Sequence, residues 1–282
     1  MMVQKDRTLI RFTRELALLR YGDTAVEQAV KTGRTDPEII PRFIVIEGPD
    51  GAGGSTQARL LERYLQSVGL ACECSTEPGD GRIGRHIRTL LQDRKNSEQG
   101  VAYAPEAKAQ FRAEWGKLAQ YFAADRAEHI WGMDGILAKT QAGMYCISER
   151  YLFSSLVYQG LSGLSDLNLM DLDDSGGSDG EAGTSISEIW ELNRDFPLPQ
   201  HFFYLDIAAD LAEQRIARRE TEEQTKREIF EQEGFLAQVR QAYLAVLEHF
   251  GRIAPGMEIH HLDANQSREV LQGQILQRLG QS

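Results

Sequence analysis

The chain has 282 residues, of which 41% are hydrophobic and 26% charged, and its formal net charge is -11. This length fits one large domain or two small ones, and the apolar fraction suffices for a sizeable core. No stretch approaches the ~18 apolar residues of a membrane helix, and the charged first residues lack a secretory-signal pattern. We therefore expect a cytoplasmic protein with no membrane partner. The acidic balance also argues against nucleic acid as the main partner, so any bound phosphate needs local cations.

The first 41 residues carry mixed charges, with apolar residues at roughly helical spacing. We expect residues 1–41 to be an N-terminal helical extension that packs on the main domain or on a partner subunit, and residues 42–282 to form that domain. Within it, residues 160–187 contain six acidic residues, six glycines and no basic residue. Such a composition cannot bury much apolar surface, and it predicts a flexible acidic insertion near residues 165–187.

The rest of the domain alternates between two kinds of pattern. Short apolar runs predict strands, and longer stretches with apolar residues at helical spacing predict helices. The expected strands are 43–46, 70–76, 144–148, 202–207 and 259–263, and the expected helices are 56–68, 82–91, 106–139 (one or two), 211–219, 235–250 and 267–279. This alternation predicts an α/β fold in three layers, a five-stranded parallel sheet with helices on both faces.

A glycine-rich loop follows the first expected strand, in the segment FIVIEGPDGAGGST (43–56). Between a buried strand and a helix, backbone N–H groups of such a loop point into one concavity and bind phosphate, helped by the helix dipole. Gly48, Gly53 and Ser55 match the P-loop pattern G-x-x-x-x-G-K-[ST]. Gly54 stands at the lysine position. The alternative is a tight turn, but four glycines in seven residues exceed what a turn requires.

The missing lysine removes a charge that normally neutralises the transferring phosphate. Without a replacement cation, transition-state stabilisation falls by several kcal/mol. Candidate cations cluster on a later helix and the segment after it: Arg215, Arg218, Arg219, Lys226 and Arg227. The alternative for this cluster is a solvated helix face whose arginines pair with neighbouring glutamates.

Six motifs, in order from about residue 42 to residue 279, resemble those of the thymidylate kinase family of P-loop nucleoside monophosphate kinases. They are GPDGAGGST (48–56), STEPGDGRIGRHIRTLL (75–91), YFAADRAEH (121–129), SERYLFSSLVYQG (148–160), FFYLDIAADLAEQRIARR (202–219) and HLDANQSREV (261–270). The resemblance implies the three-layer P-loop kinase fold with a short lid. It also implies phosphoryl transfer from ATP to dTMP with Mg²⁺, giving dTDP and ADP, by a homodimer whose candidate interface helices are 57–68 and 106–139.

The resemblance also assigns roles residue by residue. The implied ATP-binding residues are Gly48, Gly51, Ala52, Gly53, Gly54, Ser55, Thr56, Arg215, Asp263 and Ala264. The implied dTMP-binding residues are Asp50 for the 3′-hydroxyl, Arg88 for the phosphate, Phe122 and Arg126 for the base, Ser155 near the base and Tyr158 at the sugar 2′ position. Arg150, which would also hold the acceptor phosphate, Arg218 and Arg219 would be catalytic, and Ser55 and Glu149 would bind the metal.

Several of these residues also have purely structural interpretations. Phe122 at helical spacing could belong to the core, Arg126 could pair with a neighbouring acid, and Arg150 could form a structural salt bridge. The sequence departs from the family pattern at three positions: Gly54 for lysine, Thr76 for arginine and Glu149 for aspartate.

We expect an active kinase that uses lid arginines and Mg²⁺ in place of the lysine. One alternative is a catalytically weak or silent homologue that acts as a nucleotide-binding module. Another is a kinase for a different nucleoside monophosphate or for a deoxynucleoside.

Overall fold

The computed structural model describes residues 37–98, 117–161, 186–223 and 234–280. Most of the expected N-terminal extension lies outside the described residues, as do residues 106–116 of an expected helix. The acidic insertion lies outside them up to residue 185, as do Lys226 and Arg227.

A single sheet of five parallel strands forms the centre of the fold, in the order β2-β3-β1-β4-β5. This confirms the expected α/β class. The strands are β1 (Ile39–Glu47), β2 (Cys72–Thr76), β3 (Tyr145–Glu149), β4 (Leu198–Asp206) and β5 (Glu258–Asp263). β1 begins before the expected apolar run and pairs with β3 and β4, so the glycine-rich loop leaves the sheet from its central strand.

Helices connect the strands and end largely where the sequence signals predict. They are α3 (Gly54–Ser67), α4 (Arg82–Glu98), α6 (Leu118–Trp131), α7 (Ile136–Gln141), α8 (Leu152–Ser154), the π-helical turn η1 (Ser155–Gln159), α10 (Ile186–Asn193), α11 (Ala209–Glu223), α12 (Phe235–Ile253) and α13 (Arg268–Arg278). The Ser267 hydroxyl caps α13 by accepting from Val270 N at 3.3 Å.

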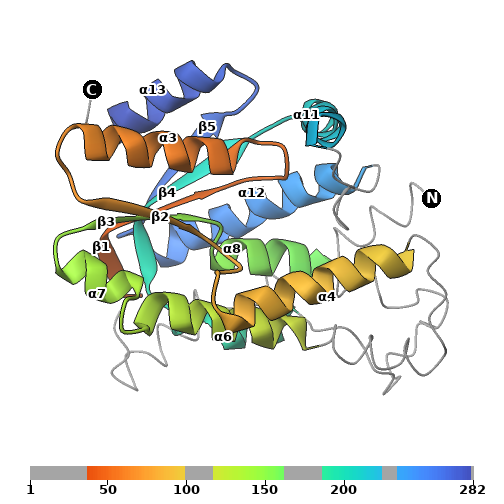
Figure 1. Cartoon of the computed structure of the whole chain (residues 1–282), viewed down its shortest axis with the longest axis horizontal. Helices are drawn as coiled ribbons and strands as arrows, with labels where there is room; N and C mark the ends of the chain where they lie inside the picture. The colour runs from red at the N-terminus through yellow and green to blue at the C-terminus, as the bar shows by residue number, and fades with distance from the viewer. Residues whose placement is uncertain (1–36, 99–116, 162–185, 224–233, 281–282) are drawn as a thin grey trace.

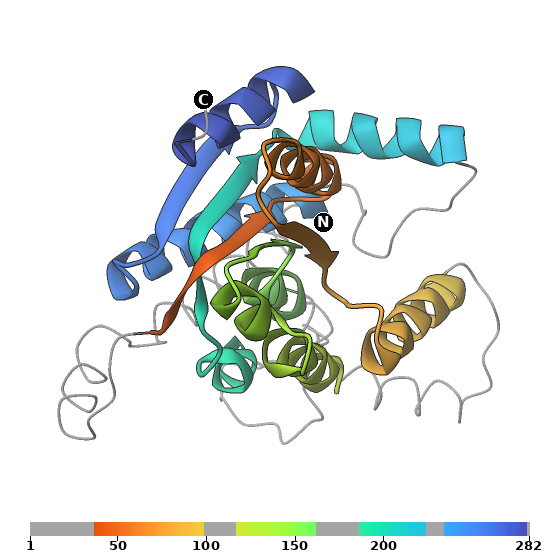
Figure 2. The same ribbon diagram turned by 60° about the vertical axis from the view of Figure 1, so that its left-hand side comes forward.

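Two apolar clusters hold helices against opposite faces of the sheet, which gives the expected three layers (Figures 1 and 2). On one face, α3, α11 and α13 pack on side chains such as Ile44, Ile46 and Phe203. On the other, α6, α8, η1, α10 and α12 pack on side chains such as Phe43 and Phe202. A smaller cluster joins α4 to α6. No helix in the described part of the chain is both long and apolar enough to cross a bilayer.

The segment expected to form one or two helices over 106–139 contains two in its described part, α6 and α7, and Gly132 and Gly135 lie between them. The helical segments at 152–159 and 186–193 were not predicted. In the first, buried residues run almost without interruption, so no helical periodicity is visible.

Candidate active site

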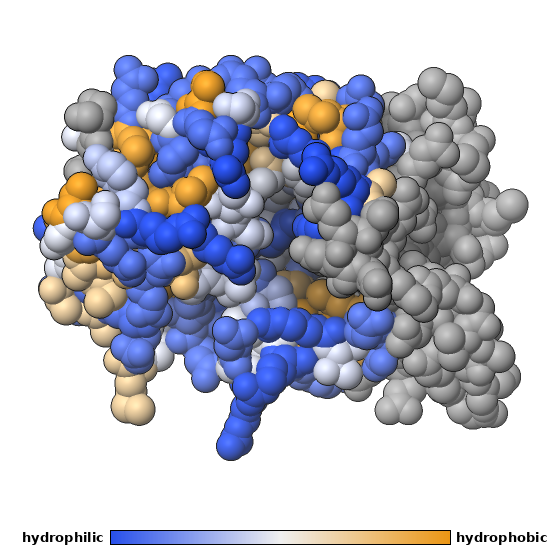
Figure 3. All heavy atoms as spheres, turned by 45° about the horizontal axis from the view of Figure 1, so that its top comes forward, coloured by the Kyte–Doolittle hydropathy of each residue, from blue (hydrophilic) through white to orange (hydrophobic). Residues whose placement is uncertain are grey.

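A cleft of about 530 Å³ opens where β1, β3 and β5 end, on the edge of the sheet where parallel α/β folds bind ligands. Its wall is the glycine-rich loop, the start of α3, the end of β3, the arginines of α11 and the start of α13. The described surface seen in Figure 3 is mostly hydrophilic, with a hollow near the centre of the view. Five arginines against three acidic side chains make the wall locally cationic in an acidic chain: Arg150, Arg215, Arg218, Arg219 and Arg268 against Glu47, Asp50 and Glu149.

The glycine-rich loop has the backbone that a phosphate cradle requires. A Cβ on Gly48 would clash with Leu205 O at 2.5 Å. Gly51 has φ +84°, and a Cβ there would clash with Ala212 O at 2.7 Å. Both positions therefore require glycine. α3 begins at Gly54, directly after this loop, and its positive N-terminal end adjoins the cleft. The turn alternative is thus incomplete, since the loop makes a tight turn and also lines a cationic cleft.

Gly54, Ser55 and Glu149 meet at one point of the loop. The Ser55 hydroxyl donates to Glu149 Oε1 at 2.5 Å, and a Cβ built on Gly54 would lie 3.3 Å from the same oxygen. The Glu149 carboxylate therefore lies beside the position where the family pattern has its lysine. Hydroxyl and carboxylate oxygens are the ligands that Mg²⁺ prefers, so this pair fits the implied metal.

The arginines expected to replace the lysine line the cleft from α11. Arg215 is half-buried and donates to Gly51 O at 3.4 Å, whereas Arg218 and Arg219 are exposed. The motif reading did not select two residues that the structure adds, Gln266 and Arg268 at the start of α13. The sequence offers little indication of their role, because both lie where a loop enters a helix, and polar residues are common at such helix starts.

Asp50 of the glycine-rich loop and Arg150, directly after β3, line the cleft and form an ion pair. The side chains of Asp50 and Arg150 are 10% and 25% exposed, so the pair is largely shielded from water. The Asp50 N–H donates to the Tyr158 hydroxyl at 3.2 Å, and the Arg150 guanidinium lies 5.1 Å from the centre of the Tyr158 ring. Arg150 has φ +70°, in the left-handed region that residues other than glycine seldom adopt. The three predicted acceptor-side residues therefore form one cluster.

Arg126 lies deeper, with only 1% of its side chain exposed. Its Nε and Nη2 donate to Glu77 Oε2 at 2.9 and 2.6 Å, Nη2 also donates to Ser155 Oγ at 3.0 Å, and Nη1 donates to Asn193 Oδ1. The pairing with Asp125 or Glu128 considered from sequence is not the one found, since the partner is Glu77. This network links the segment after β2 to α6. The implied contact with the base would come in addition to these structural hydrogen bonds of Arg126 and Ser155.

The other predicted residues lie at varied distances from the cleft. Ala264 lines it, whereas Asp263 is exposed and accepts hydrogen bonds from Asn265 and Gln266 in its own turn. Arg88 on α4 donates to Gly79 O and Asp80 Oδ1. Phe122 is half-buried and packs on the cluster between α4 and α6, as the core alternative proposed. The roles of these residues remain predictions.

Glu47, the last residue of β1, is a buried carboxyl directly behind the loop, with 1% of the residue exposed. Tyr151 N–H and the Ser154 hydroxyl donate to its two oxygens, the latter at 3.0 Å. Burial nevertheless raises the pKa of Glu47 to about 7, against the lowering effect of the Arg150 charge and these hydrogen bonds.

This pKa predicts how stability depends on pH. The folded state holds the Glu47 proton up to about pH 7, whereas the unfolded chain releases it near its ordinary pKa of 4.5. The Glu47 contribution to stability is therefore full below pH 4.5 and is lost as the pH rises through 7. Relative to Glu47→Gln, we expect the wild type to lose on the order of 3 kcal/mol between pH 4.5 and 8. Urea unfolding of both proteins across this range measures the difference, and parallel curves would show that Glu47 does not titrate.

The fold and the cleft together define a P-loop phosphotransferase of the α/β class. A model of the family described as thymidylate kinase matches residues 46–173 and 178–275, so the chain belongs to the thymidylate kinase family. It is 33% identical to the "Putative thymidylate kinase" of Treponema pallidum over 86% of this chain and 96% of that protein. It is also 34% identical to the "Probable thymidylate kinase" of Thermococcus kodakarensis, over 83% of this chain and 95% of that protein. It is 29% identical to the "Thymidylate kinase" of a Geobacillus strain, over 74% of this chain and 84% of that protein.

Proposed function

We propose that the protein transfers the γ-phosphoryl group of ATP to dTMP, giving dTDP and ADP. The observation that carries this proposal is the shared cleft, which is lined by the glycine-rich loop, the α11 arginines and the Asp50–Arg150 pair. Phosphoryl transfer between two anions requires positioning and cations rather than a covalent nucleophile, and this wall supplies both. Family membership supports dTMP as the acceptor.

The chain's own groups divide the work between donor and acceptor. The loop N–H groups and the α3 N-terminus bind the β- and γ-phosphates of ATP, and the α11 arginines neutralise charge on the transferring group. Arg150 presents a planar guanidinium to the acceptor phosphate, and Asp50 orients that guanidinium and the acceptor sugar. An acceptor phosphate oxygen then forms a bond to the γ-phosphorus of ATP. At the same time the bond between the γ-phosphorus and the bridging oxygen breaks, and that oxygen leaves with ADP.

We propose that Mg²⁺ accompanies ATP. Ser55 Oγ and a Glu149 oxygen, 2.5 Å apart beside the loop, are the groups that would hold it directly or through water. When bound, the ion would spread the negative charge of the donor phosphates. Glu149 has one methylene more than the aspartate of the family pattern, and its carboxylate contacts Ser55.

A panel of acceptors tests the proposed function. Purified full-length protein, ATP and Mg²⁺ are incubated with each of dTMP, dUMP, UMP, CMP, AMP and GMP, and with thymidine. Nucleotide products are separated and quantified by chromatography. We expect dTDP to form fastest. Formation of another diphosphate in preference to dTDP, phosphorylation of thymidine, or no transfer to any acceptor despite ATP binding would each contradict the proposal.

We also propose a homodimer in the cytosol. The three cysteines are all free thiols, which suits a reducing compartment. Val68, at the end of α3, and Trp131, at the end of α6, are half exposed although they are large and apolar, and both belong to the candidate interface helices. We expect sedimentation at micromolar concentration to give twice the 31.7 kDa chain mass. A monomer under these conditions would contradict the dimer.

A further inference from the structure

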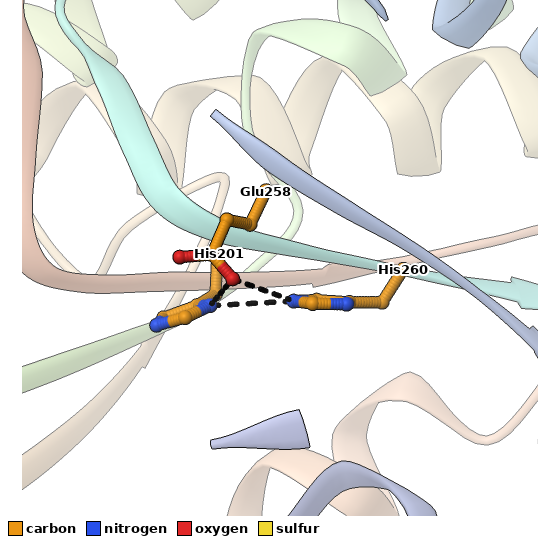
Figure 4. A group of neighbouring side chains, drawn as sticks. All are labelled: His201, Glu258 and His260. Carbon is orange, nitrogen blue, oxygen red and sulfur yellow. Dashed lines mark hydrogen bonds and ion pairs between the residues drawn. The ribbon is translucent and has the colours of Figure 1, made fainter. Parts of the chain in front are cut away.

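Three potential metal ligands converge beside strands β4 and β5 (Figure 4). His201 comes from β4, and Glu258 and His260 come from the edge strand β5. In the register of the two strands, His201 pairs with Glu258 and Phe203 with His260, so all three side chains lie on one face. His201 lies five residues before the end of β4 at Asp206, which places the group about 16 Å from the cleft edge of the sheet.

The spacing of the three ligand atoms fits a tetrahedral ion. His201 Nδ1 lies 3.3 Å from His260 Nε2 and 3.5 Å from Glu258 Oε2, and His260 Nε2 lies 3.9 Å from the same oxygen. Tetrahedral bonds of 2.0–2.1 Å to Zn²⁺ place neighbouring ligand atoms about 3.3–3.4 Å apart. Among the described residues, His201, Glu258 and His260 form a group of histidine and carboxylate side chains whose ligand atoms all lie within 4.8 Å of one another.

The surroundings hold the two imidazoles in place. His260 stacks on Phe203 at 4.6 Å, and the side chains of His201 and His260 are only 12% and 11% exposed. Glu258 is 54% exposed and leaves the group open to ions from solvent.

Without a cation, the contacts within this group are one hydrogen bond of 3.3 Å between the two imidazole nitrogens and longer contacts with the exposed Glu258 carboxylate. Each neutral imidazole carries one N–H and one lone pair, and the carboxylate only accepts. Two ring nitrogens and one carboxylate oxygen face the same point, so at most two N–H protons are available there. The distance from His260 Nε2 to Glu258 Oε2, 3.9 Å, is too long for a hydrogen bond. A cation would satisfy all three lone pairs at once.

We propose that His201 Nδ1, His260 Nε2 and Glu258 Oε2 form a binding site for Zn²⁺ that fastens the edge strand β5 to β4. Imidazole with a carboxylate suits Zn²⁺ better than Mg²⁺, which prefers oxygen ligands alone. Solvent supplies the fourth ligand. The role is structural, because β5 is hydrogen-bonded to a strand on one side only and runs on into Ala264, Gln266 and Arg268 of the cleft wall.

The test uses tag-free full-length protein, stripped with a chelator and studied without nucleotide. Zn²⁺ is titrated in competition with a colour-forming chelator, and Co²⁺ is added separately to record the visible absorption typical of tetrahedral coordination. The variants are Glu258→Gln, whose exposed position makes a folding defect least expected, and His260→Gln. The matched control is His261→Gln, because His261 is the next residue of β5 and contacts Tyr204 on the opposite face.

We expect one Zn²⁺ per chain in the wild type and in His261→Gln, and an affinity at least tenfold lower in Glu258→Gln and His260→Gln. At 100 times the Kd, Zn²⁺ should raise the folded-to-unfolded ratio of the wild type about 100-fold, measured as a higher Tm, and should not do so in His260→Gln. Equal uptake by the wild type and His260→Gln would place the metal elsewhere, for example at the cysteines. That result, or no uptake by the wild type, would overturn the proposal.

Discussion

Replacing Arg218 or Arg219 by alanine is expected to lower kcat for dTMP phosphorylation by 10²- to 10³-fold, with a much smaller change in the KM for ATP. Both arginines line the cleft opposite the glycine-rich loop, whose lysine position is occupied by Gly54. A cation that stabilises charge mainly in the transition state affects kcat more than ground-state binding, and loss of one such donor has this magnitude. Steady-state kinetics under saturating Mg-ATP measure the effect.

Arg252→Ala is the matched control, because Arg252 is an exposed helical arginine on α12 that pairs with Glu248 and does not line the cleft. Its kcat should equal that of the wild type. If Arg218→Ala and Arg219→Ala also retain wild-type kcat, then the solvated-face interpretation of these arginines is correct. The cationic role would then fall to Arg215 or Arg268, the other cleft arginines outside the Asp50–Arg150 pair.

Arg150→Ala is expected to lower kcat/KM for dTMP by about 10- to 200-fold, through both constants. The acceptor phosphate would lose a charge-assisted contact of roughly 1.5–3 kcal/mol. Asp50, with 10% of its side chain exposed, would also lose its ion-pair partner and repel the incoming phosphate. Kinetics with varied dTMP at saturating ATP measure the loss, and circular dichroism checks the fold.

Arg150→Lys separates charge from shape. Lysine keeps the positive charge but cannot form the planar two-point contact of a guanidinium, so we expect it to recover only part of the activity. The KM for ATP should stay near the wild-type value in both variants. Unchanged kinetics with dTMP in Arg150→Ala would show that the Asp50–Arg150 pair is a structural salt bridge.

The fold was predictable because its signals are local. Runs such as Phe43–Ile46 and the helical spacing in 235–250 each lie within one element, and alternation of the two fixes a parallel sheet with two helical layers. The segment at 152–159 escaped prediction because burial on nearly every side removes the periodicity on which such predictions depend, whereas the short helix at 186–193 begins inside the stretch assigned to the acidic insertion.

The candidate site was predictable where its residues are contiguous, as in the loop from Gly48 to Thr56. Its partners from distant segments were harder to identify. The Ser55–Glu149 contact and the Glu77–Arg126 pair join residues 94 and 49 positions apart, and composition does not reveal such pairs. Arg268 belongs to the cleft only because β5 ends beside the loop. The three residues of the proposed zinc site also come together only through the register of β4 and β5.

The central claim is that this kinase works without a lysine in its phosphate loop, and kcat of the wild type against Gly54→Lys, under saturating Mg-ATP and dTMP, tests it most directly. A Cβ at this position would lie 3.3 Å from Glu149 Oε1, so an introduced lysine side chain would crowd the carboxylate that accepts from Ser55. We predict measurable transfer by the wild type and equal or lower kcat in Gly54→Lys. A wild type without detectable transfer, with activity restored by the lysine, would contradict the account.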